Sequence, residues 1–96
     1  MQQIVINAHY GGFGLSQEAM DLYTELCEAA GVHAHTYSHE IARDCPHLVE
    51  TVRTLGPAAD TRYSNLKVVE IPDGVQWSVH EYDGSEWVAE NHRTWS

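Results

Sequence analysis

The chain has 96 residues, enough for a single domain over residues 1–96, and 43% of them are hydrophobic, enough for one modest core. Five Lys and Arg stand against fourteen Asp and Glu, and this formal net charge of −9 opposes nucleic-acid binding over a broad face. No run approaches the roughly 18 apolar residues of a membrane span and no secretory signal is recognisable, so we expect a cytoplasmic protein without membrane contact. In that compartment we expect Cys27 and Cys45 to remain reduced.

The first half of the chain predicts two strands and a helix. Residues 2–7, QQIVIN, are short, apolar and β-branched, which indicates a buried strand. After a glycine-rich loop, Ser16 is a good N-cap for a helix whose apolar residues recur every three or four positions until Gly31. Residues 32–39, VHAHTYSH, alternate in polarity and predict a second strand. If it pairs beside the first strand, a parallel, right-handed crossover results.

The second half predicts one helix and three strands. The helix spans 45–56, with Cys45 as N-cap and Pro46 as its first residue. Residues 66–71 predict a strand, and two further strands flank Asp83-Gly84, a strong signal for a hairpin turn. The order β-α-β-α-β-β-β predicts an α+β fold, with two helices packed on one face of a mixed sheet of about four to five strands.

The glycine-rich loop is the first candidate ligand site. In a parallel βα unit, ligands tend to bind beyond the carboxyl ends of the strands, where this loop should lie. Its glycines would let backbone N–H groups approach a ligand oxygen, the helix N-terminus favours negative charge, and its aromatic rings can stack on a base. The alternative is a tight turn in which an aromatic ring fixes the helix to the sheet. The candidate residues are His9, Tyr10, Gly11, Gly12, Phe13, Gly14 and Ser16.

The C-terminal tail is the second candidate. Arg93 can hold a phosphate or carboxylate through two hydrogen bonds, and Trp95 can close a pocket. With His92, these residues would complete the site if the tail reaches the loop. The alternative is a tail docked by its tryptophan, with the arginine paired to a surface carboxylate.

The remaining polar residues do not form an evident catalytic set. His33 and His35 would share one side of the predicted strand, but no spacing supplies further metal ligands, so we expect no metal and no cofactor. Glu81 and Glu86 would face each other across the hairpin, and we expect a splayed, solvated tip rather than an acid/base pair.

Three strings resemble short proteins encoded by tailed bacteriophages, a group without an established activity. They are IVINAHYGGFGLS near the start, HLVETVRTLG in the middle and LKVVEIPDGVQWSVHEYDGSEWVAENHRTW near the end. In that group the second helix commonly opens with Asp-Pro, whereas here Cys45 separates Asp44 from Pro46. The resemblance implies an accessory protein acting in the host cytoplasm, where such proteins often oppose host defence.

Together these observations favour a protein that binds a nucleotide or related phosphorylated molecule, sequestering a host immune signal as a homo-oligomer without chemistry. The alternative is an acidic inhibitor that docks on a basic host enzyme, with the loop and tail as its contact residues. A third reading is a small phosphoester or nucleotide hydrolase using His9 or His92.

Overall fold

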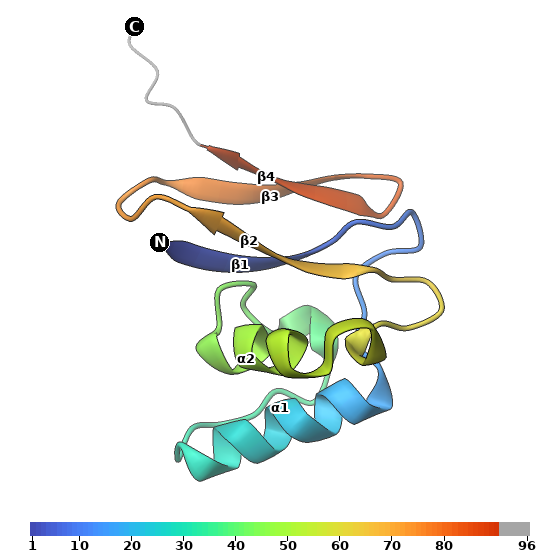
Figure 1. Ribbon diagram of the computed structural model, residues 1–96, viewed down its shortest axis with the longest axis vertical. Helices are drawn as coiled ribbons and strands as arrows, with labels where there is room; N and C mark the ends of the chain where they lie inside the picture. The colour runs from blue at the N-terminus through green and yellow to red at the C-terminus, as the bar shows by residue number, and fades with distance from the viewer. Residues whose placement is uncertain (91–96) are drawn as a thin grey trace, which may run out of the picture.

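The computed structural model describes residues 1–90 and contains two helices and four strands in that range (Figure 1). The α+β class with two helices, predicted from the sequence, is confirmed. Two short 3₁₀ turns, at Ser38–Glu40 and Gly56–Ala59, precede and follow the second helix. The main elements are β1 (Gln2–Asn7), α1 (Gln17–Ala29), α2 (Pro46–Leu55), β2 (Leu66–Ile71), β3 (Trp77–Tyr82) and β4 (Ser85–Glu90).

The elements stack in layers around the β1–β2 pair. Figure 1 shows both helices on one side of this pair, with α2 nearer the strands and α1 outside it, and the β3–β4 hairpin on the other side. Because side chains alternate along a strand, Val5 packs into the helical core while Ile4 and Ile6 pack against the hairpin. β1 is therefore buried on both faces, and its apolar run reflects this position.

The segment 32–39 is not a strand, which corrects the sequence expectation. It forms a loop and the turn at Ser38–Glu40, and the NH of His35 donates to the hydroxyl of Tyr23 on α1 at 3.1 Å. The predicted parallel crossover is therefore absent from residues 1–90. The alternating polarity of residues 32–39 arises because Ala34 packs on the core while the neighbouring histidines are exposed.

The strand pairing also differs from a single mixed sheet. β1 pairs antiparallel with β2, joining Gln2 to Ile71 and Asn7 to Leu66, and β3 pairs antiparallel with β4 as a separate two-stranded sheet. The second edge of β1 is already occupied, since Val5 donates its NH to the carbonyl of Arg43 at 2.8 Å. Neither pair therefore extends the other into one continuous sheet.

Local chemistry explains where the helices begin. The hydroxyl of Ser16 accepts the NH of Ala19 at 3.1 Å, so the predicted N-cap of α1 is confirmed. Cys45 is the N-cap of α2 without a side-chain hydrogen bond, and Pro46 follows it at the first helical position, as the sequence predicts. The hairpin turn is Asp83-Gly84, with φ of 54° and 90°, the pattern of a two-residue turn that suits antiparallel strands.

Candidate functional site

Three loops meet at the end of the molecule where α1 begins, and we call residues 8–14, 60–65 and 82–84 the three-loop end (Figure 1). The side chain of Asn7, fully buried at the end of β1, holds them together. Its amide nitrogen donates to the carbonyls of His9 at 2.8 Å and Gly84 at 2.9 Å. Its amide oxygen accepts the NH groups of Asn65 at 2.8 Å and His9 at 3.2 Å. One side chain thus fixes all three loops with a complete set of hydrogen bonds.

Two glycines allow the loops to touch. A Cβ at Gly11 would lie 2.2 Å from the carbonyl oxygen of Tyr63, and one at Gly84 would lie 2.5 Å from that of Tyr10. Gly12 is different: it has φ of +97°, but a Cβ there meets no atom within 4 Å. The first two glycines therefore serve close packing between loops, and the third serves the backbone turn.

Two backbone N–H groups at the start of α1, beside the glycine-rich loop, are occupied. The NH of Ser16 donates to the carbonyl of Ala59 at 2.9 Å, and the NH of Ala19 is capped. Nδ1 of His9 lies 3.1 Å from both the nitrogen of Gly11 and the carbonyl oxygen of Tyr63. It accepts the NH of Gly11 in the tautomer protonated on Nε2 and donates to Tyr63 in the tautomer protonated on Nδ1. The loop thus offers a phosphate fewer free donors than the sequence suggests.

The structure brings the predicted loop residues together but divides their roles. His9, Tyr10 and Gly11 are exposed, whereas Phe13 and Ser16 are partly buried. The predicted tail residues His92, Arg93 and Trp95 lie outside the described residues. The ligand-binding role of the whole set stays a prediction.

A buried ion pair lies beside the three-loop end. Both guanidinium Nη atoms of Arg43 donate to the Glu86 carboxylate, and the two side chains are 22% and 8% exposed. Glu86 also accepts the NH of Asn7 at 2.8 Å, so it closes the free edge of β1. The guanidinium carbon of Arg43 lies 3.6 Å from the centre of the Phe13 ring. The ring of Phe13 is therefore occupied by a cation of the protein itself.

This ion pair corrects the expected solvated hairpin tip. Glu81 and Glu86 are direct partners in the hairpin, as predicted, but only Glu81 is exposed. The like charges coexist because one is neutralised by Arg43, while the other accepts the NH of Gly84 at 3.1 Å. Sequence reasoning missed this partner because nothing in the local spacing links residues 43 and 86.

Three tyrosine side chains project from the three-loop end into solvent. Tyr10, Tyr63 and Tyr82 are 69%, 59% and 73% exposed, and they belong to the glycine-rich loop, the 60–65 loop and the last residue of β3 before the hairpin turn. The backbone of Gly11 lies against that of Tyr63, and the backbone of Gly84 lies against that of Tyr10, so the loops that carry the tyrosines are in direct contact. Exposed tyrosines on loops held by a rigid scaffold are typical of surfaces that recognise other proteins.

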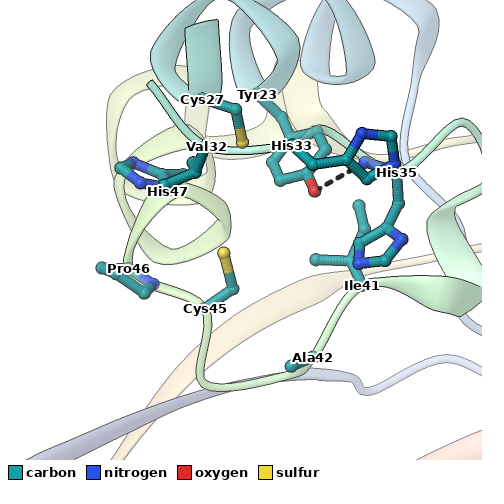
Figure 2. A pocket seen from close by; sticks show the side chains of 10 residues that line it. All are labelled: Tyr23, Cys27, Val32, His33, His35, Ile41, Ala42, Cys45, Pro46 and His47. Atoms are coloured by element: carbon teal, nitrogen blue, oxygen red, sulfur yellow. Dashed lines mark hydrogen bonds between the residues drawn. The ribbon is translucent and has the colours of Figure 1, made fainter. Parts of the chain in front are cut away.

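A second feature lies toward the other end of α1, and Figure 2 shows it from close by. A cavity of about 320 Å³ opens between α1, the loop after it and the start of α2. Figure 2 shows the sulfur atoms of Cys27 and Cys45 pointing toward the space between them, so we call it the Cys27–Cys45 cavity. Both cysteines are free thiols. Its lining residues are Tyr23, Cys27, Val32, His33, His35, Ile41, Ala42, Cys45, Pro46 and His47.

Two groups of this cavity have shifted acidities. Burial, the largest cause, raises the pKa of the Cys27 thiol above 9.0, against the opposing effect of a hydrogen bond from Tyr23. Burial likewise raises the pKa of Tyr23 above 10.0, and the NH of His35 opposes this shift. Both groups are therefore neutral near pH 7, and the cavity floor carries no charge from them.

The described part of the chain lacks two kinds of feature. In residues 1–90, no group of three or more His, Cys, Asp or Glu side chains is arranged to hold a metal ion. Within the same range, no helix is long and apolar enough to cross a membrane.

The sequence contained a weak signal for the site's organising residue. Asn7 is the one polar residue among the buried residues 4–7 of β1. It directly precedes the glycine-rich loop, and a buried polar group at such a position requires partners. Comparison with known proteins adds no relative: no protein-family model, no curated protein and no solved structure matches the chain.

Proposed function

We propose that this protein binds another protein through the three tyrosines of the three-loop end, and that the partner presents a basic surface. The observation that carries the proposal is the exposure of Tyr10, Tyr63 and Tyr82 on loops locked together by Asn7. Tyrosine supplies large contact area with few rotatable bonds, so a prearranged group of them loses little entropy on binding.

Charge supports a basic partner. Glu81 and Asp83 are exposed at the hairpin tip, and the whole chain carries a formal charge of −9. Such a surface accelerates association with a positively charged protein and repels acidic ones. The resemblance to short phage proteins favours a partner in the cytoplasm of an infected bacterium, which agrees with the inhibitor reading of the sequence.

The nucleotide reading has less support at this site. A bound phosphate needs free donors, and the NH of Ser16 already has an acceptor within the protein, as does the NH of Gly11 in the His9 tautomer protonated on Nε2. Phe13, expected to stack on a base, is covered by Arg43. These contacts favour a loop that supports a protein-binding surface.

The test compares capture by matched variants. The immobilised protein, a Tyr10→Ser/Tyr63→Ser/Tyr82→Ser variant and a Tyr37→Ser control are each incubated with bacterial lysate. Tyr37 is 61% exposed and lies in the loop after α1, outside the residues of the three-loop end. A partner identified by mass spectrometry is then purified and its affinity measured calorimetrically at low and high salt.

We expect Tyr37→Ser to retain the partner and the triple variant to lose it. One hot-spot residue contributes about 2 kcal/mol, or roughly 30-fold in affinity, and the affinity should fall as salt rises. Equal binding by both variants would refute the proposed surface. A heat-released nucleotide in stoichiometric amount, lost in Gly12→Val, would instead support the nucleotide reading.

A further inference from the structure

The Cys27–Cys45 cavity is separate from the three-loop end. Cys27 lies near the last turn of α1, whereas the three-loop end precedes its first turn. The helix has 13 residues, which corresponds to about 20 Å along its axis. A ligand in this cavity therefore needs no residue of the protein-binding surface proposed above.

The size of the cavity suits a small organic molecule. Its volume of about 320 Å³ is at the lower end of the range for ligand pockets, which begins near 300 Å³. Val32, at its edge, is an apolar side chain left 48% exposed. An apolar edge of this kind gains free energy when a ligand removes it from water.

The lining chemistry indicates an uncharged ligand. None of the ten lining residues is Lys, Arg, Asp or Glu, so apart from its three histidines the lining offers a phosphate or carboxylate no ionic partner. The pKa values of the Cys27 thiol and the Tyr23 hydroxyl are raised by burial, so neither supplies charge near pH 7.

The arrangement of the side chains favours a planar ring. In Figure 2, His33 and His35 lie on one side of the space and His47 on the other, with the two sulfur atoms between them. Thioether and thiol sulfur atoms make favourable contacts with aromatic rings, and imidazole rings stack on them. Residues 1–90 form no hydrogen bond to the ring nitrogens of His33 or His47, which leaves these atoms available to a ligand.

From this geometry we propose that the Cys27–Cys45 cavity binds a neutral aromatic compound, either a nitrogen heterocycle or a phenol. The ring is held between the imidazoles and against the sulfur atoms of Cys27 and Cys45. A polar atom of the ligand hydrogen-bonds to His33 or His47 at the edge of the cavity.

The test uses neutral and charged probes of similar size in ¹H–¹⁵N NMR titrations of the whole chain. Phenol is compared with benzoate, indole with indole-3-carboxylate, and adenine is added as a third neutral ring. The variant Cys45→Leu fills the cavity, and it removes no capping hydrogen bond because Cys45 makes none. The control Ala58→Leu adds the same side chain at an exposed position outside the cavity.

We expect at least one neutral probe to shift the amide signals of residues 23–27, 32–35, 41–45 and 47 and to leave those of the three-loop end unchanged. The matched charged probe should bind at least about tenfold more weakly, because its charged group loses hydration in the cavity. Cys45→Leu should abolish the shifts and Ala58→Leu should keep them. Equal affinity for the charged and neutral probes would overturn the proposal, as would shifts that persist in Cys45→Leu. So would the absence of shifts with all three neutral rings.

A second measurement keeps the proposal testable if Cys45→Leu does not fold. Iodoacetamide alkylation of the native protein is followed by peptide mass spectrometry, which separates Cys45, a partly exposed thiol, from the buried Cys27. A saturating neutral probe should slow the alkylation of Cys45 several-fold. An unchanged rate would place the probe outside the cavity and refute the assignment.

Discussion

Replacing Asn7 with alanine should detach the three loops from one another. The amide of Asn7 makes four hydrogen bonds, two as donor and two as acceptor, and its side chain is fully buried. At about 1 kcal/mol for each bond, Asn7→Ala should lower the free energy of unfolding by about 4 kcal/mol. For a domain of this size, that corresponds to a fall in Tm of about 15–30 °C.

The control for this prediction is Asn65→Ala. Asn65 is exposed, and it contributes its backbone NH, which alanine retains. The free energy of unfolding of the Asn65→Ala variant should stay within about 0.5 kcal/mol of that of the unmodified protein. Urea unfolding followed by circular dichroism measures both variants, and a comparable slope with urea concentration shows that the same surface is exposed.

If Asn7→Ala lowers the free energy of unfolding by less than about 1 kcal/mol, as a substitution at an exposed position would, the predicted role of Asn7 is refuted. That result would mean that water or rearranged loops satisfy the four partner groups. A loss of stability without a loss of partner affinity would refute a different step, the link between loop order and recognition. The two measurements therefore separate the structural role of Asn7 from its functional role.

Three further substitutions test other parts of the structure. Glu86→Gln should lower the free energy of unfolding in urea by about 2 kcal/mol, because the partly buried Arg43 loses its counter-ion, whereas Glu81→Gln at an exposed position should lower it by less than about 0.5 kcal/mol; equal effects would contradict the ion pair. Gly11→Ala should lower Tm more than Gly14→Ala, because a Cβ at Gly11 would clash with the carbonyl oxygen of Tyr63 whereas one at Gly14 would lie 3.4 Å from a methyl group of Thr61; the reverse order would refute this contact. Because the pKa of Cys27 is raised above 9.0, its contribution to stability should be complete below pH 9 and decline above it; Cys27→Ala should flatten the unfolding free energy between pH 8 and 10.

The sequence alone determined the local elements of this protein. Ser16 begins α1, Pro46 begins α2, and Asp83-Gly84 forms the hairpin turn, as predicted. Each of these features depends on neighbours within a few residues. A serine hydroxyl reaches an NH three residues ahead, a proline fixes its own φ, and a short turn fixes the register of adjacent strands.

Tertiary structure decided the rest, because the decisive contacts join residues far apart in the chain. The segment 32–39 has the alternation of a strand, but β1, its predicted partner, offers it no edge. β2 takes one edge of β1, and Arg43 and Glu86 take hydrogen-bonding groups on the other. The glycine-rich loop carries the signs of a ligand site, yet Gly11 makes room for the 60–65 loop that packs on it, and Gly12 serves the backbone turn. Short-range patterns record which conformations a segment tolerates, whereas the partners of β1 and of Asn7 are chosen by packing across the whole domain.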